Sequence, residues 1–140
     1  MAPTLDCFLT AQAPIYEQVL AELQSGRKRT HWMWFIFPQI AGLGMSETSR
    51  RYAIRDLDEA RAYLTHPILG ARLKQCARLL LDVPDRSAHE ILGSPDDLKL
   101  RSCATLFALV SPAGSVFHQL LDRFYGGQED TRTLELSRKS

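Results

Sequence analysis

Residues 31–39 read HWMWFIFPQ, the stretch of the chain that is richest in aromatic residues. Four aromatic residues fall between Trp32 and Phe37, and Pro38 prevents a helix from continuing through the segment. Because each large ring buries about 150–250 Å², so short and apolar a segment needs contacts on most sides. We therefore expect a short buried segment at the centre of the core, with Trp34 and Phe37 nearly fully buried.

Apolar residues recur at helical spacing on both sides of this stretch. An apolar stripe over residues 15–23 precedes it, and further stripes over residues 67–82 and 116–124 follow it. The pairs Asp56/Glu59 and Ser87/Glu90 have the spacing of capping boxes. These patterns predict helices throughout, and neither alternation of period two nor a hairpin signal predicts a strand.

The helix expected from a Ser94 N-cap to about Val110 is apolar around most of its circumference. Such a helix is usually central to its fold. The sequence therefore predicts an all-α fold, in which a single multihelical globular domain over residues 1–140 has about six to eight helices around the buried segment 31–38. Residues from about 128 to 140 are expected to form a tail or a short terminal helix.

The charge balance excludes some classes of partner. Seventeen Lys and Arg against sixteen Asp and Glu leave a formal charge of +1, so no overall field attracts nucleic acid or an anionic membrane. No apolar run approaches the roughly 20 residues of a membrane span, and the N-terminus does not read as a signal peptide. We expect no membrane partner, and the oligomeric state is left open.

The three cysteines, Cys7, Cys76 and Cys103, are widely spaced and odd in number. They fit neither a disulfide framework nor a zinc-finger spacing, so we expect a cytoplasmic protein. No histidine pair has metal-ligand spacing, and no metal or other cofactor is expected.

Polar groups of several kinds cluster around the aromatic stretch. Within about twenty residues the chain combines cations, an imidazole, two indoles, an amide and a glycine turn. A lysine on the predicted central helix either snorkels to solvent or faces a partner or anion. The candidate ligand-binding residues are Lys28, Arg29, His31, Trp32, Trp34, Gln39, Gly42, Gly44, Ser46, Tyr52 and Lys99.

Because His31 and Gln39 bracket the buried segment, both should be rigidly held. We expect them to line one shared cavity with Lys99, near the turn at Gly42–Gly44. Catalytic residues are not identified by any motif. His31 and His66 are weak candidates for an acid or base, and no nucleophile lies in a G-x-S-x-G pattern.

The sequence also resembles a known family. The HWMWFIFPQ string, followed by Gly42-Leu43-Gly44 and Ser46, is similar to an uncharacterised bacterial family recorded as domain of unknown function eighteen-ten, whose members are sometimes mislabelled calpastatin. The likeness continues to about Asp130, through Tyr52-Ala53-Ile54, His66-Pro67, Asp97-Lys99-Leu100 and Thr105-Leu106-Phe107. The resemblance implies a multihelical fold with an unusually short buried central helix, and it implies no established activity.

Our leading hypothesis is a cytosolic domain that binds a small anionic or nucleotide-like molecule, with hydrolase or transferase activity left open. One alternative is a protein–protein interaction module without catalysis. A further alternative is nucleic-acid binding, suggested by Arg27-Lys28-Arg29 beside aromatic residues but disfavoured by the near-neutral charge.

Overall fold

The computed structural model describes residues 4–44 and 46–138, and it confirms the all-α prediction for that part of the chain. The described residues form ten helices, more than expected because several are very short. They are α1 (Thr4–Gln12), α2 (Tyr16–Gln24), α3 (Met33–Ile36), α4 (Glu47–Arg51), α5 (Leu57–Thr65), α6 (Leu69–Asp82), α7 (Ala88–Leu92), α8 (Asp96–Ala108), α9 (Val116–Tyr125) and α10 (Thr131–Arg138).

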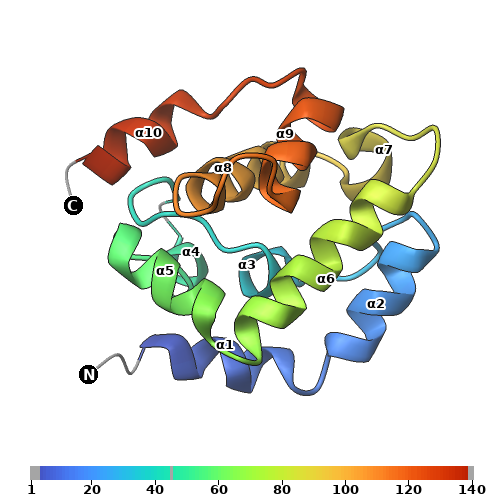
Figure 1. The fold of residues 1–140 in the computed structure, drawn as a ribbon. Helices are drawn as coiled ribbons and strands as arrows, with labels where there is room; N and C mark the ends of the chain where they lie inside the picture. Colours follow the sequence, from blue (N-terminus) through green and yellow to red (C-terminus); the bar gives the residue numbers. More distant parts are fainter. Residues whose placement is uncertain (1–3, 45, 139–140) are drawn as a thin grey trace.

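The four-residue helix α3 lies at the centre of the molecule, as Figure 1 shows. It packs against α1 and α6, while α8 and α9 form the most extensive helix pair of the fold. Trp32 and Phe37, on either side of α3, are each 1% exposed. Trp34 is only half-buried, so the expectation of its complete burial was wrong. Its place on α3 turns the ring toward the molecular surface, beside α8.

A buried carboxylate locks the chain on the N-terminal side of α3. Glu22, near the end of α2, is 3% exposed. Its oxygens accept hydrogen bonds from the backbone N–H groups of Arg29 (2.7 Å) and Thr30 (3.1 Å), and from the Thr30 hydroxyl (2.7 Å). The indole N–H of Trp32 (2.8 Å) and the amide of Gln18 (2.8 Å) donate to the same group.

These five donors decide the ionisation of Glu22. Burial alone raises the pKa of a carboxyl group, because it penalises the charged form. Here the donors from Arg29, Thr30, Gln18 and Trp32 outweigh burial and lower the pKa of Glu22 to about 2. The segment that leads into α3 is therefore held by an ionised, fully hydrogen-bonded side chain.

On its C-terminal side the segment is held by the backbone. Ile40 and Ile54 form an isolated parallel bridge. The carbonyl of Gln39 accepts from Ile54 N, and Ala41 N donates to the Ile54 carbonyl, both at 2.8 Å. The chain around Gln39 is thereby fixed against the segment that precedes α5.

Helices α5 and α6 approach each other unusually closely. A β-carbon at Gly70 would lie 1.9 Å from the carbonyl oxygen of Leu64, so only glycine permits this distance. Helix α6 also packs against α2 and α9, and so connects N-terminal and C-terminal helices of the fold.

The predicted helix starts are confirmed in part. Ser87 and Glu90 form a complete capping box at α7. At α5, Asp56 accepts from Glu59 N, but the Glu59 carboxylate accepts from Arg55 N rather than from the cap itself. Ser94 does not cap α8, since that helix begins at Asp96 without a side-chain cap.

Among residues 4–44 and 46–138, no helix has the length and apolar content needed to cross a membrane.

Candidate functional site

An aspartate at the start of α8 pairs with two lysines that are far from each other in the sequence. Asp96 Oδ2 lies 2.9 Å from Lys28 Nζ, and Asp96 Oδ1 lies 3.3 Å from Lys99 Nζ. The side chains of Lys28, Asp96 and Lys99 are 8%, 17% and 21% exposed. One carboxylate thus serves two ammonium groups, which leaves this partly buried group of side chains with an excess of positive charge.

Each lysine also lies against an indole. Lys99 Nζ is 3.8 Å from the centre of the Trp34 ring, and Lys28 Nζ is 5.2 Å from that of Trp32. Such cation–π contacts contribute about 0.5–2 kcal/mol, more where the cation is desolvated. The two indoles differ in role, because Trp32 is buried and bonded to Glu22 whereas Trp34 borders two hollows at the surface.

The first hollow encloses about 80 Å³ and the second about 220 Å³. Trp34 and Lys99 line both of them. The first is also lined by Lys28, His31, Trp32, Met33 and Asp96, and the second by Gln39, Leu43, Gly44, Pro95, Leu98 and Ser102. We had expected His31, Gln39 and Lys99 in one cavity; instead, Lys99 adjoins both hollows while His31 and Gln39 lie in different ones.

Gln39 is a largely buried polar residue of the second hollow. It is 9% exposed, and its side-chain amide makes no hydrogen bond with any residue that the structure describes. The bridge between Ile40 and Ile54 fixes its backbone. Arg101 Nε is the one fully buried side-chain nitrogen or oxygen without a partner in the described part of the chain, so the Gln39 amide keeps some contact with solvent and is available to a ligand or a water molecule.

The turn at Gly42–Gly44 packs against neighbouring side chains and does not border one cavity shared by His31, Gln39 and Lys99. A β-carbon at Gly44 would lie 2.5 Å from Ser49 Oγ and 3.7 Å from the Trp34 ring, which is why no side chain fits there. Gly42 has a φ of +102° and faces Leu136 of α10. Only Gly44 of the two glycines lines a hollow.

Several predicted site residues have other partners and line neither hollow. Ser46 caps α4 by accepting from Ser49 N at 3.1 Å. The Tyr52 ring packs edge-on against Phe35, with centroids 4.7 Å apart. The side chain of Arg29 is exposed while its backbone N–H binds Glu22.

Of the two weak catalytic candidates, His66 serves as a cap. Its Nδ1 accepts from Ile68 N (3.1 Å) and Leu69 N (3.2 Å) at the start of α6. His31 is exposed at the rim of the first hollow. Two of the cysteines are poor nucleophiles, because burial raises the pKa of Cys76 to about 12 and that of Cys103 well above its ordinary value.

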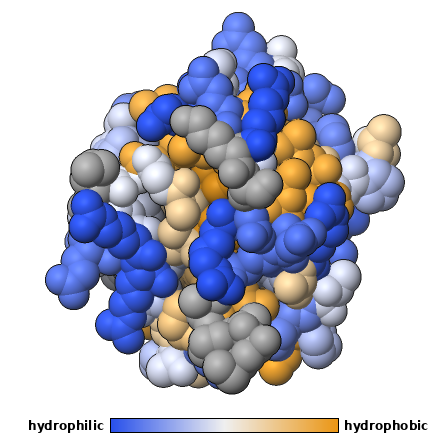
Figure 2. All heavy atoms as spheres, turned by 90° about the vertical axis from the view of Figure 1, so that its left-hand side faces the viewer, coloured by the Kyte–Doolittle hydropathy of each residue, from blue (hydrophilic) through white to orange (hydrophobic). Residues whose placement is uncertain are grey.

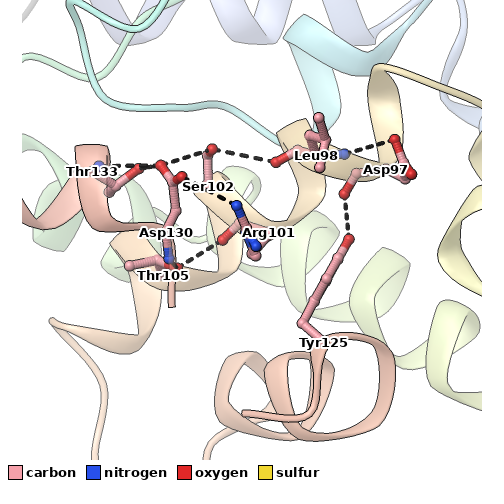
Figure 3. A network of polar contacts seen from close by, with 8 residues as sticks. All are labelled: Asp97, Leu98, Arg101, Ser102, Thr105, Tyr125, Asp130 and Thr133. Carbon is pink, nitrogen blue, oxygen red and sulfur yellow. Dashed lines mark hydrogen bonds and ion pairs between the residues drawn. The ribbon is translucent and has the colours of Figure 1, made fainter. Parts of the chain in front are cut away.

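A polar network adjoins the second hollow at Ser102, as Figure 3 shows. The Ser102 hydroxyl donates to Asp130 (3.1 Å) and to the Leu98 carbonyl (3.3 Å). Asp130 also accepts from Thr133 N at 3.1 Å and lies 3.7 Å from Arg101 Nη2. The network therefore attaches the start of α10 to the helix that carries Lys99.

Sequence reasoning missed some residues of the two hollows, above all Asp96. Its spacing of three residues from Lys99 is that of a helical ion pair, and this local signal could have identified it. Leu98 and Ser102 also line the second hollow and were not among the candidate binding residues. In residues 4–44 and 46–138, no group of three His, Cys, Asp or Glu side chains is arranged to hold a metal ion.

Comparison with known proteins places this geometry in a family. No curated protein matches the chain. The crystal structure of the conserved hypothetical protein Rv1873 from Mycobacterium tuberculosis is similar, with 54% sequence identity, a TM-score of 0.92 and 94% of each chain covered. The model of the family described as protein of unknown function (DUF1810) matches residues 2–137. The chain, with its short buried central helix, belongs to that family.

Proposed function

We propose that this protein binds a small anionic molecule at the two hollows that meet at Trp34 and Lys99. The observation that carries the proposal is the placement of Lys99, whose ammonium borders both hollows while it rests on the Trp34 ring. Asp96 is shared with Lys28 and cannot neutralise both lysines. An anion that enters from solvent supplies the missing negative charge.

The walls of the second hollow suit a small molecule. Leu43, Pro95 and Leu98 add apolar surface beside the polar groups, a combination typical of small-molecule sites. At about 220 Å³ the hollow is smaller than most drug-sized sites. The ligand is therefore small, or part of it extends toward Lys28 and His31 in the first hollow.

The test is a binding experiment with phosphate-bearing probes. Inorganic phosphate, ribose 5-phosphate and 5′-nucleoside monophosphates are added, and thermal unfolding and calorimetric titration are measured. A probe at about 100 times its Kd stabilises the protein by about 2.7 kcal/mol. Lys99→Met should weaken binding at least tenfold, since the ammonium is lost while the stem still covers Trp34.

The matched control is Lys74→Met, which removes an exposed lysine on α6 that lines neither hollow. It should bind every probe as the unaltered protein does. Equal binding by Lys99→Met and Lys74→Met would contradict the proposal.

An interaction module is the second candidate, and one observation favours it. Leu98 is 51% exposed at the rim of the second hollow. The other large apolar side chains found exposed, Ile68 and Leu109, belong to different parts of the chain.

On the side that carries α10 and α5, hydrophilic side chains interrupt the apolar surface, as Figure 2 shows. Chromatography with light scattering after Leu98→Ser tests whether this residue supports self-association.

Two features of the chain bear on the partner and the compartment. Of the three consecutive cations, Arg27 and Arg29 are exposed but Lys28 points inward to Asp96. This split weakens the case for a nucleic-acid surface, which needs a continuous basic stripe. Cys76 and Cys103 are buried thiols outside any disulfide, which supports a reducing, cytoplasmic location as part of the proposal. For any hydrolase or transferase chemistry, His31 is the candidate acid or base, because it lines the first hollow.

A further inference from the structure

The second hollow carries a group that binding an anion does not use. Lys99 attracts negative charge, but Gln39 presents an uncharged amide, 9% exposed, with no hydrogen-bond partner among the described residues. Both side chains line the same hollow. A simple anion can accept a hydrogen bond from the amide N–H₂. It gives the amide oxygen no donor, and the partial negative charge of that oxygen repels it.

The backbone at Gln39 is held from both directions along the chain. Pro38, directly before it, is buried, and the carbonyl of Gln39 itself accepts from Ile54 N at 2.8 Å. A fixed backbone and a side chain only 9% exposed leave the amide less freedom than a surface glutamine has, so less entropy is lost on binding. The residue has the properties of a specificity determinant rather than of a mobile surface group.

The chemistry of the amide defines what it binds. A glutamine side chain offers a donor and an acceptor side by side, and it pairs with two adjacent atoms of a nucleobase edge, as glutamine does with adenine. The neighbouring walls, Leu43, Pro95 and Leu98, are apolar and suit the face of a flat ring. The volume of about 220 Å³ limits the hollow to a single ring system with its attached sugar.

We infer, on the basis of the proposed function, that the ligand is of the nucleotide class: its phosphate pairs with Lys99 and the polar edge of its base pairs with Gln39. Sugar phosphates without a base satisfy Lys99 but leave the amide of Gln39 unpaired. A compound that covers the amide without pairing it removes the amide's contact with solvent and returns no hydrogen bond, so the site discriminates between the two kinds of compound.

The experiment compares the four 5′-nucleoside monophosphates with ribose 5-phosphate by calorimetric titration. At least one nucleotide should bind the unaltered protein tenfold or more tightly than ribose 5-phosphate does. Gln39→Leu should abolish that ratio and leave the affinity for ribose 5-phosphate unchanged. Lys99→Met should weaken both kinds of probe by the same factor. Gln128→Leu, an exposed glutamine that lines neither hollow, is the matched control.

A second measurement needs no substitution. In the unaltered protein, the side-chain N–H₂ resonances of Gln39 should shift when the nucleotide is added and stay in place with ribose 5-phosphate. Equal affinities for the two kinds of probe, or a ratio that survives Gln39→Leu, would overturn this inference and leave the anion site standing. If no probe of either kind binds the unaltered protein, both the inference and the proposed function fail.

Discussion

The two ends of the aromatic segment are held in opposite ways. Before α3, the buried carboxylate of Glu22 accepts five hydrogen bonds, one of them from the Trp32 indole. After α3, the amide of Gln39, a residue that is 9% exposed against 3% for Glu22, accepts and donates none within the described residues. A buried polar group can therefore serve the fold or remain free for a ligand, and its partners distinguish the two cases.

The indoles of the segment provide the largest expected contrast. Trp32→Ala should lower the free energy of unfolding by about 4–5 kcal/mol, because it leaves a cavity and removes a donor to Glu22. Trp34→Ala should cost about 1–2 kcal/mol, since that ring is half-buried. Urea unfolding of both variants measures the difference. Equal losses would show that α3 is anchored by both rings alike.

Removing the carboxylate should have the next largest effect. Glu22→Leu leaves the N–H groups of Arg29, Thr30 and Trp32 without their acceptor, and we expect a loss of about 3–4 kcal/mol in urea unfolding. The exposed Glu17 on the same helix is the control, and Glu17→Leu should change stability by less than about 0.5 kcal/mol. A loss below about 1 kcal/mol in Glu22→Leu would mean that the backbone donors find other partners.

Acid should weaken the hydrogen bonds of Glu22 without a substitution, because it protonates the carboxylate. The pKa of Glu22 is about 2 in the folded chain, below its ordinary 4.5. Its contribution is thus fully present above pH 4.5 and is lost as the pH falls toward 2, by about 3 kcal/mol in all. Carbon NMR of the Glu22 carboxyl group follows this titration directly. A midpoint near 4.5 would show that the five donors do not favour the charged form.

The smallest expected effect is at the other end of the segment. Gln39→Leu removes an amide without a partner, so stability should change by less than about 1 kcal/mol and can increase. Thermal unfolding of this variant beside Glu22→Leu compares the two ends of the segment in one experiment. A loss of 2 kcal/mol or more at Gln39 would reveal that its amide supports the fold.

The sequence predicted the helical class and the central place of residues 31–38, because periodicity, caps and aromatic density are local signals. It did not reveal that Trp32 rather than Trp34 is the buried indole. That difference depends on Glu22, ten residues earlier, whose carboxylate reaches Trp32 only once α2 is folded against the segment. The sequence patterns also gave no indication of α1, which lies outside every apolar stripe that we identified.

The candidate site was predictable in its composition and not in its geometry. Lys28, His31, Trp34, Gln39 and Lys99 do line the two hollows. How they are divided depends on the ion pair of Lys28 with Asp96 and on the bridge between Ile40 and Ile54, which join segments separate in sequence. Non-local contacts of this kind leave no periodic trace from which they can be inferred.

The attachment of α10 has a consequence for the order in which the molecule opens. Only Thr133 and Ser137 of this helix are buried, whereas α8 is buried along most of its length. Elements with few buried groups exchange their amide protons through sub-global unfolding, well before the core opens. Release of α10 also separates Asp130 from Ser102 and Leu136 from Gly42. Native-state hydrogen exchange should therefore detect a ligand in the second hollow first as slower exchange in α10, a helix that does not itself line the hollow.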